Sequence, residues 1–434
     1  MKKIQPIRGT RDIMENEFLV YLNILNVFRN LTSNYGFREI STPIIEDSEV
    51  FKKTLGLTSD IIKKETYTFK DRSDNEITLR PEGTAPIVRC FVNNKLHQTL
   101  PQKITYSGPM FRYDRPQQGR LRQFHQLGAE IIGPKDISSD LELIYMARDF
   151  LNRIDLPENF FKIHVNNLGD KESRQKYSKE LQNFFQDHRK NLTPESLDRL
   201  NKNPLRILDT KNKEEQKLLK KTPKLKNFLS NESLDIFDQF KEGSKKLQIP
   251  IVVNDNLVRG LDYYNHICYE FVSDRLGSKD SFLAGGRYDG LIKDMGGPDY
   301  PGCGFAAGIE RIILICGSVI PILPEKYLMI IALDKENKIK AMKITNQIRK
   351  VIDDELSKKN STSFSVDLIF KNNLSKGLKY ASEKKATHAV IIGEKEISQE
   401  NIIIKDLKKN KVQGICFQIY FFGKNEKISY FRHC

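Results

Sequence analysis

Cysteine is scarce in this chain of 434 residues, and its cysteines do not fall into pairs. A zinc site or a disulfide framework would need cysteines at short or matched spacings. The six in this sequence are scattered, with no Cys-x-x-Cys among them: Cys90, Cys268, Cys303, Cys316, Cys416 and Cys434. The cysteine pattern therefore indicates neither kind of site and is consistent with a reducing compartment.

Long apolar segments are also missing. The N-terminal stretch MKKIQPIRGTRDIMENE has no apolar core of the kind that a signal peptide needs. No apolar run elsewhere is long enough to cross a bilayer. We therefore expect a soluble intracellular protein located in the cytoplasm, without a membrane partner.

Two common signatures of catalytic sites are absent as well. No Gly-x-x-x-x-Gly-Lys-Ser/Thr stretch is present, which excludes a P-loop around a phosphate. No segment with a helical pattern carries paired histidines at metal-binding spacing, so the sequence predicts no protein metal site. His125 lies in a strand pattern, where a structural role is the ordinary interpretation of a histidine.

Acidic residues are fewer than basic ones. The chain has 71 Lys and Arg against 56 Asp and Glu, a formal net charge of +15. Such a balance favours a polyanionic partner but does not choose between nucleic acid and a membrane surface. A lysine-rich composition can also reflect a base-biased genome, and the charge alone leaves both explanations open.

The length and the texture of the sequence predict more than one domain. In residues 1–325, runs of strands with few intervening helices predict an α+β fold on an antiparallel sheet flanked by helices. A lysine-rich helical stretch over about 170–245 is interpreted as an insertion between two halves of the sheet, or as a solvated appendage. Alternating strands and helices over 326–434 predict a three-layer α/β domain, joined by the linker PILPEK at 321–326.

The first elements of the chain predict an interface. Residues 13–35 repeat apolar side chains at three- and four-residue steps, which indicates a helix that Gly36 ends as a left-handed cap. The following stretch, GFREISTPIIED (36–47), is typical of a strand that Pro43 confines to a sheet edge. An amphipathic helix that leads into an edge strand needs protection, so we expect a homodimer formed through both.

Two hairpins follow. YTFK (67–70) and NEITLR (75–80) surround a turn, and Thr84 is placed to cap a helix over 85–95. A second hairpin surrounds FRYDRPQQGRLRQFHQ, which contains four arginines, namely Arg112, Arg115, Arg120 and Arg122.

Side chains of the second hairpin form a polar face. Alternation in an extended strand puts Arg122, Phe124 and Gln126 on one face, which Gly128 and Glu130 continue. Arginine pairs with phosphate or carboxylate and stacks on a purine, and Phe124 can supply an opposite stacking surface. These residue types indicate a binding face for a nucleotide, although a solvated basic hairpin remains the alternative.

Three further segments place polar side chains beside glycine. They are RGLDYY (259–264), AGGRYDGL (284–291) and GFAAGIER (304–311), in which Arg311 lies near the start of a helix. Core strands rarely carry so many guanidinium groups and tyrosines beside glycine pairs. We therefore interpret them as the other walls of the same site.

The motifs resemble those of class II aminoacyl-tRNA synthetases and, within that class, of histidyl-tRNA synthetases. The helix–strand unit ending at Pro43 is similar to motif 1, FRYDRPQQGRLRQFHQLGAE to motif 2 and GFAAGIER to motif 3. LVRGLDYYN and AGGRYDG resemble the two segments peculiar to the histidine enzymes, and RGTRD and LRPEGT resemble other fixed stretches. The resemblance covers nearly the whole chain, and the two histidine-specific segments are its most specific part.

The resemblance implies a ligase that activates histidine with ATP and Mg²⁺ and transfers it to the 3′ end of tRNA(His). Arg112 would hold the ATP α-phosphate and the histidine carboxylate, while Phe124 and Arg311 would stack on opposite faces of adenine. Arg120 would reach the distal phosphates with the help of Mg²⁺. At the turn, Arg115 and Gln117 would face the acceptor end of the tRNA, and no DNA partner is expected.

The resemblance also implies a histidine pocket. Gln126 and Glu82 would take the ammonium group, and Glu130 and Tyr264 would bracket the imidazole. Arg259, with Arg112, would neutralise charge on the pentavalent phosphorus, which makes these two the catalytic pair. The full set of implied histidine contacts is Glu82, Thr84, Arg112, Gln126, Glu130, Arg259, Tyr263, Tyr264 and Tyr288.

The C-terminal domain resembles the anticodon-binding domain of the same enzymes, with NNLSKGLKYASEKKATHAVIIGEKE the nearest stretch. Two departures stand out. The segment 411–434 has a strand-and-turn pattern where the family usually ends in a helix, and Asp114 stands where the family commonly has Glu.

Three other functions are alternatives to a histidine–tRNA ligase. A regulatory paralogue would bind histidine without aminoacylation, but such proteins lack the RGLDYY arginine and the anticodon domain, which are both present here. A class II synthetase for another amino acid is disfavoured by Glu130 together with Tyr264. A plain basic RNA-binding module explains none of the glycine-flanked polar segments.

Overall fold

The chain forms two compact units, Met1–Pro321 and Ile322–Cys434. A computed structural model gives their structure over residues 3–55, 61–210, 212–277, 281–317, 326–333, 338–358, 364–371, 373–394, 403–407 and 411–413. The expected linker PILPEK falls outside these residues except for Lys326. Among the described residues, no helix combines the length and the apolar character that crossing a membrane requires.

The first unit is built on an eight-stranded, mainly antiparallel sheet. In spatial order its strands are β1 (Arg38–Glu39), β5 (Gln102–Phe111), β6 (Gln123–Ile132), β11 (Gly302–Gly308), β10 (Ser281–Arg287), β9 (Asn265–Val272), β7 (Lys162–Asn167) and β8 (Ile251–Val253). Only the two edge strands pair in parallel, β1 with β5 and β8 with β7. This confirms the expected α+β class with an antiparallel sheet.

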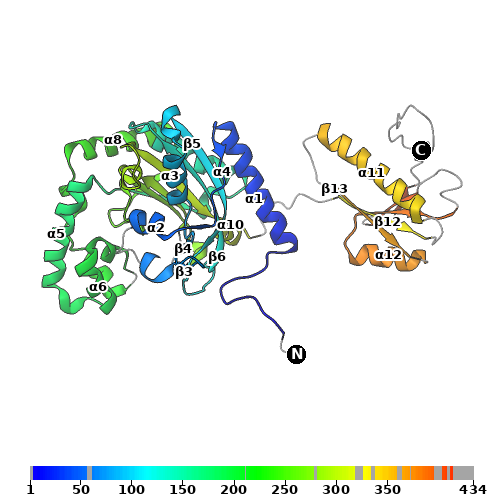
Figure 1. Cartoon of the computed structure of the whole chain (residues 1–434), viewed down its shortest axis with the longest axis horizontal. Coiled ribbons are helices and arrows are strands. Elements are labelled where there is room, and N and C mark those ends of the chain that lie inside the picture. Colours follow the sequence, from blue (N-terminus) through cyan, green and yellow to red (C-terminus); the bar gives the residue numbers. More distant parts are fainter. Residues whose placement is uncertain are drawn as a thin grey trace. The chain divides into compact units, whose positions relative to one another are not determined.

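Helices α1 (Glu15–Asn34), α4 (Ser138–Arg153) and α10 (Ile309–Cys316) pack on this sheet and on one another (Figure 1). Phe28 of α1 lies 5.3 Å from the ring of Phe150 in α4 and 6.4 Å from Phe305 in β11. Such aromatic contacts bury large apolar areas and hold helix and sheet together. Gly36 follows α1 with φ +79°, the left-handed conformation expected of it.

The segment with Pro43 forms two short edge strands in place of one continuous strand. β1 pairs at the edge of the large sheet, and β2 (Ile45–Asp47) lies at the edge of a small sheet ordered β2–β4–β3. The strands β3 (Tyr67–Lys70) and β4 (Glu76–Leu79) form the expected hairpin. Helices α2 (Ser48–Leu55), α3 (Thr84–Asn93) and the single turn α9 (Leu291–Asp294) complete this part.

A helical insertion connects β7 with β8. Its helices are α5 (Lys171–Asp187), α6 (Pro194–Lys202), α7 (Lys213–Leu219) and α8 (Asn231–Lys246), separated by short 3₁₀ turns that include η5 (Pro204–Asp209). Each helix begins at a side chain that accepts a hydrogen bond from the first turn, namely Asp170, Thr193, Asn212 and Ser230. The helices share a core with the first unit through residues such as Tyr177, Leu181 and Leu208.

One expected strand is shorter in the structure. LVRGLDYYNHICYEF was expected to be extended from Leu257, but β9 begins only at Asn265. The carbonyl groups of Gly260, Asp262 and Tyr264 accept hydrogen bonds from arginine side chains of the insertion. Because these acceptors are taken by side chains, the residues before Asn265 form an irregular loop.

The second unit alternates strands and helices as expected. Its elements are β12 (Lys326–Ala332), α11 (Lys338–Lys358), β13 (Phe364–Phe370), α12 (Leu374–Glu383), β14 (His388–Ile392), β15 (Ile403–Asp406) and β16 (Lys411–Gln413). The sheet order is β13–β12–β14–β15–β16, with β13, β12 and β14 parallel. Separate apolar clusters pack α11 and α12 on the sheet. Of the tail 411–434, expected to be strand and turn, residues 411–413 form β16 and the rest lies outside the described residues.

A buried ion pair should contribute strongly to the stability of the first unit. Arg287 of β10 pairs with Asp140 of α4, with side chains 3% and 0% exposed. Asp140→Asn leaves the buried guanidinium with only the Asp289 carboxylate at 3.5 Å, and removing one partner of a buried ion pair typically costs about 3–5 kcal/mol. We expect a marked fall in melting temperature by calorimetry. Asp149→Asn, which breaks the exposed Arg153 pair on the same helix, should change stability by less than about 1 kcal/mol.

Candidate active site

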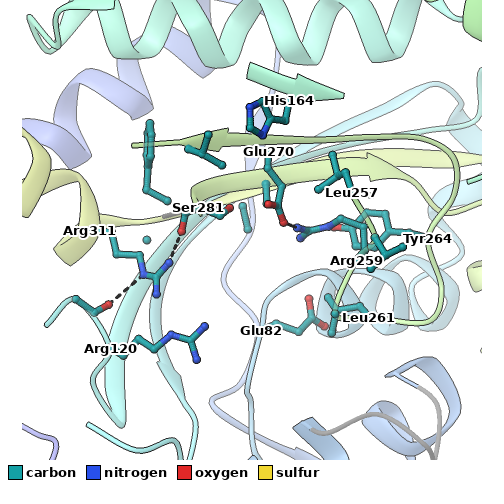
Figure 2. Close-up of a pocket in the computed structure, with 18 of the residues that line it drawn as sticks. Glu82, Arg120, His164, Leu257, Arg259, Leu261, Tyr264, Glu270, Ser281 and Arg311 are labelled. Atoms are coloured by element: carbon teal, nitrogen blue, oxygen red, sulfur yellow. Dashed lines mark hydrogen bonds and ion pairs between the residues drawn. The ribbon is translucent and has the colours of Figure 1, made fainter. Parts of the chain in front are cut away.

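A cavity of about 700 Å³ opens in the first unit, where segments far apart in the chain converge. Its walls come from the β5–β6 hairpin, the stretch that leads into α3, strands β7, β9 and β10, the junction of β11 with α10, the loop before β9, and the insertion from η5 to α7. Figure 2 shows side chains from several of these segments. The charged residues that line it are Glu82, Arg112, Asp114, Arg120, Lys220, Arg259, Glu270, Glu310 and Arg311. A concave site lined by charged groups from distant segments is a binding site rather than a packing defect.

The β5–β6 hairpin supplies one wall. Its register pairs Gly108 with Gln126 and Met110 with Phe124, so Phe124 and Gln126 share the face that lines the cavity. The guanidinium of Arg112 lies 5.2 Å from the centre of the Phe124 ring, and its Nε donates to the carbonyl of Pro81 at 2.8 Å. Arg112 is therefore held between the hairpin and the LRPEGT stretch.

Arg122 does not share this face, which corrects the expectation. Strand β6 begins at Gln123, so the alternation of side chains does not extend back to residue 122. The guanidinium of Arg122 stacks 3.8 Å from the centre of the Tyr113 ring, away from the cavity lining. Arg115 and Gln117 are exposed in the turn and do not line the cavity either.

Two further guanidinium groups lie near Arg112. Arg120 forms an ion pair with Asp114, and Arg311 donates to the carbonyls of Gly119 at 3.1 Å and of Ser281 (Figure 2). Burial, together with the positive charges of Arg120 and Arg112, lowers the pKa of Arg311 to about 10. Three converging cations with this mutual repulsion create a positive field that attracts a polyanion.

Arg259 reaches the cavity from the loop before β9. Its guanidinium pairs with Glu270 of β9 and lies 5.0 Å from the centre of the Tyr264 ring (Figure 2). Glu270 lines the cavity but was not singled out from the sequence. The available signal was its position as the one carboxylate in the strand NHICYEFV.

At the start of helix α3, Glu82 takes the capping role that was expected of Thr84. The Glu82 carboxylate accepts from the backbone N–H groups of Thr84 at 2.7 Å and Ala85 at 2.8 Å, so it caps α3. Thr84 was expected to be this cap, but it is the first residue of the helix and its hydroxyl donates to Glu130 at 2.8 Å. Both side chains nevertheless line the cavity.

Glu130 lies behind this wall and is fully buried. Its other oxygen accepts from the hydroxyl of Tyr288 at 2.9 Å. Burial raises the pKa of Glu130 to about 8. A Cβ at Gly304 would lie 1.6 Å from the carboxylate, so only glycine leaves room for it. Neither Glu130 nor Tyr288 is among the described residues that line the cavity.

Between these groups the cavity has an available acceptor. The side-chain oxygen of Gln126 is buried and has no hydrogen-bond partner among the described residues. A buried acceptor without a partner is costly, so it favours a ligand that carries a donor. Tyr263 and Tyr264, with ring centres 4.6 Å apart, form the adjacent wall.

The sequence left other parts of the site unidentified. Glu310 follows the glycine-rich strand and accepts from the backbone N–H of His125 at 2.9 Å, while their side chains are 2.8 Å apart. His125 therefore has a structural role, as expected. The insertion adds Leu208, Thr210, Gln216, Leu219 and Lys220 to the lining, although no pattern in the sequence marked them.

Comparisons with known proteins agree with these motifs. A family model described as histidyl-tRNA synthetase matches residues 9–312. The histidine–tRNA ligase of Gluconobacter oxydans is 40% identical over 415 residues, covering 96% of this chain and 97% of its own. The chloroplastic histidine–tRNA ligase of Porphyra purpurea is 42% identical over 406 residues, covering 93% of this chain and 92% of its own.

Solved structures of similar fold include a histidyl-tRNA synthetase. The crystal structure of apo S. aureus histidyl-tRNA synthetase matches with a TM-score of 0.75 and 30% identity, covering 95% of this chain and 97% of that one. A Bacillus halodurans protein described as an ATP phosphoribosyltransferase regulatory subunit/histidyl-tRNA synthetase has a TM-score of 0.62 and 20% identity, covering 90% and 99%, so it shows the fold alone. Because the family model matches residues 9–312 and relatives of about 40% identity cover nearly the whole chain, the chain belongs to the histidyl-tRNA synthetase family.

Proposed function

We propose that this chain is an ATP-dependent histidine–tRNA ligase, in keeping with its family. The observation that carries the proposal is the convergence of Arg112, Arg120 and Arg311 around Phe124 in a cavity that a second group of polar side chains also lines. The arginine group fits a nucleoside triphosphate, and the second group fits a small amino acid. A histidine-binding regulator without ligase activity is not favoured, because Arg259 and the second unit are both present.

The reaction has two steps. A carboxylate oxygen of histidine attacks the α-phosphorus of ATP, the bond to the β-phosphate breaks, and pyrophosphate leaves. The 3′-terminal ribose hydroxyl of tRNA(His) then attacks the carbonyl carbon of histidyl-adenylate, and AMP leaves. Because the carboxylate is already ionised, the first step needs no general base, and positioning with neutralisation of charge supplies the catalysis.

The nucleotide contacts follow from the positions of the cations. Phe124 and Arg311 would enclose adenine, Arg112 would bind the α-phosphate and the histidine carboxylate, and Arg120 would bind the distal phosphates. Asp114 pairs with Arg120 in the free protein, so this carboxylate keeps the guanidinium in place until phosphate replaces it.

Mg²⁺ would arrive with the triphosphate. Among the described residues there is no cluster of three or more His, Cys, Asp or Glu suited to a metal ion. Asp114, Glu270 and Glu310 line the cavity and can contribute single oxygen ligands. Mg²⁺ commonly binds through one or two carboxylates with substrate phosphates and water, so this donor set fits an ion carried by ATP, whose phosphate charge it would reduce.

The amino acid would occupy the part of the same cavity that the second group of polar side chains lines. The unpaired oxygen of Gln126 and the Glu82 carboxylate suit the ammonium group, with Thr84 beside them. Tyr264 and Glu130 would contact the imidazole, with Tyr263 and Tyr288 supporting them. Specificity would come from hydrogen bonds to both imidazole nitrogens, since unpaired buried polar groups reject competitors strongly.

We assign residues 1–325 to the catalytic domain, with the helical insertion at about 170–245, and residues 326–434 to anticodon binding. Arg115 and Gln117, exposed in the turn between β5 and β6, would face the acceptor end of the tRNA. The cytoplasm would be the site of action, with no DNA or membrane partner.

ATP–pyrophosphate exchange across the twenty amino acids tests the proposal directly. Histidine should support exchange at least about 100-fold better than any other amino acid, because only imidazole pairs the buried polar groups. Comparable exchange with another amino acid would refute the specificity for histidine. No exchange at all, in a protein that binds histidine, would refute the ligase assignment.

Glu130→Gln should raise the KM for histidine far more than the KM for ATP. The same change should alter the pH dependence of stability. The folded-state pKa of Glu130, about 8, lies above the ordinary value of 4.5 for a glutamate, so the wild-type protein takes up a proton on folding and loses stability as pH rises from about 5 to 8.

Melting temperatures of the wild-type protein and of Glu130→Gln between pH 5 and 8.5 measure this difference. The variant lacks the titrating carboxyl, so its melting temperature should change less with pH. Equal slopes together with equal histidine KM values would place Glu130 outside the pocket.

Arg259→Ala should reduce exchange by about 10²–10³, because a positioned donor to the reacting phosphate is lost. Lysine should restore only part of the rate, since a point charge cannot reproduce a two-pronged contact. Glu270→Gln is the matched control, because it removes the same ion pair but keeps the guanidinium. If both variants lose activity and melting temperature in parallel, Arg259 is a structural brace and not a catalytic group.

We also propose a homodimer formed through α1, β1 and β2. Ile44 and Ile45 are 41% and 49% exposed beside the edge strand β2, and Phe18 of α1 is 43% exposed. Ile45→Lys should shift sedimentation from dimer to monomer and reduce exchange. Leu234→Lys, at an exposed leucine on the insertion, should leave the dimer intact. A wild-type monomer with full activity would contradict the proposal.

A further inference from the structure

The loop that carries the catalytic arginine has no regular structure of its own. Residues 254–264 connect β8 with β9 without a helix or strand, yet they bring Arg259, Tyr263 and Tyr264 to the cavity. At Gly260 an added Cβ would meet no atom within 4 Å, although the leucines on either side of it in the loop are buried in the apolar core. Polar contacts to the loop backbone add to this packing and to the ion pair of Arg259.

Those contacts come from three side chains of the helical insertion. Arg206 in η5 donates through Nη2 to the carbonyl of Gly260 at 2.5 Å and to the Asp262 carboxylate at 3.1 Å. Asn203, at the end of α6, donates to the same carboxylate oxygen at 3.0 Å. We call Arg174, Asn203 and Arg206 the loop clamp.

The third member of the loop clamp acts on the far end of the loop. Arg174 in α5 donates through Nη1 to the carbonyl of Asp262 at 3.2 Å and to that of Tyr264 at 2.5 Å. The loop clamp therefore holds three alternate carbonyl groups and one carboxylate, all within the five residues that follow Arg259. Hydrogen bonds from charged donors are stronger than neutral ones, and these lie where water has little access.

The loop clamp lies on the side of the loop opposite the substrates. A separate small cavity of about 80 Å³ is lined by all three clamp residues and by Asp262. None of these four is among the described residues that line the large cavity, whereas Arg259, Leu261 and Tyr264 line both. Arg206 is only 9% exposed. The clamp side chains therefore do not line the large cavity, and their contacts act on it through the backbone of the loop.

We propose that Arg174, Asn203 and Arg206 are positioning residues that make the helical insertion part of the machinery for histidine activation. The inference rests on the proposed function and assigns the insertion a role in the first step, when no tRNA is bound. A preorganised donor loses its effect when its backbone shifts, because a misplacement of about 1 Å can reduce a rate about 100-fold. The loop clamp prevents such a shift at Arg259.

Pyrophosphate exchange without tRNA, on the full-length protein, tests this role. Arg206→Ala should lower kcat/KM for histidine about 10- to 100-fold and leave the KM for ATP within about twofold. Arg206→Lys should be intermediate, because a flexible ammonium group can reach the same two acceptors but holds them less rigidly than the planar guanidinium. Lys202→Ala is the matched control, because Lys202 lies next to Asn203 but pairs with the exposed Asp198. It should behave as wild type.

A second measurement does not depend on activity. Amide hydrogen exchange of peptides spanning 254–264 should be faster in Arg206→Ala and Asn203→Ala than in wild type and Lys202→Ala, with the sheet strands unchanged. Unchanged protection of this loop, or wild-type exchange kinetics in Arg206→Ala, would overturn the proposal.

Possible unfolding of a variant is covered by the same design. If Arg206→Ala is unfolded by calorimetry, the milder Asn203→Ala decides, and its loop protection must fall at an unchanged melting temperature. If wild-type protein shows no histidine-dependent exchange, the ligase assignment fails, while the loop-protection result still decides whether the clamp exists.

Discussion

The antiparallel pairing of β6 with β5 on one side and β11 on the other is the constraint on which the site depends. This register sets Gln126 opposite both Gly108 and Gly308, and Glu130 opposite Gly304. Glycine partners leave space above the strand, which the polar side chains of β6 occupy. A shift by one residue would turn Phe124, Gln126 and Glu130 to the helix-covered face, so register and binding site cannot be separated.

Charge is distributed around this frame so that no guanidinium depends on a ligand for its orientation. Asp114 orients Arg120, Glu270 orients Arg259, and backbone carbonyls orient Arg311. Fixed dipoles and paired charges of this kind cost little reorganisation when a charged ligand arrives. The same partners limit the repulsion between cations that lie in one cavity.

The sequence predicted those features that neighbouring residues determine and missed those that depend on distant parts of the chain. The helix ended by Gly36, both hairpins and the alternating C-terminal unit follow from periodicity and turn residues, and the structure agrees. The side-chain face of β6 was predicted as far as the strand extends, but Arg122 lies beyond its end. Glu82 as a cap, Glu270 as a counter-ion and the irregular loop at 257–264 were missed, because each depends on contacts between segments far apart in the chain. Resemblance to a family identified the motifs but could not supply these partners.

The glycine opposite Glu130 also bears on how such a pocket can change over evolution. Since any side chain at residue 304 would collide with the carboxylate, neither position can be altered alone without losing packing or leaving a void. A new amino acid specificity would require coordinated replacement on two neighbouring strands and at Tyr288, which also contacts Glu130. Stepwise drift is therefore blocked behind the proposed histidine pocket, whereas the proposed nucleotide end, built from arginine side chains that each have a separate partner, offers more single-step routes. The two ends of the cavity thus differ in how easily single substitutions can change them. The backbone of a glycine limits one end, whereas the other end is formed by side chains that can be replaced one at a time.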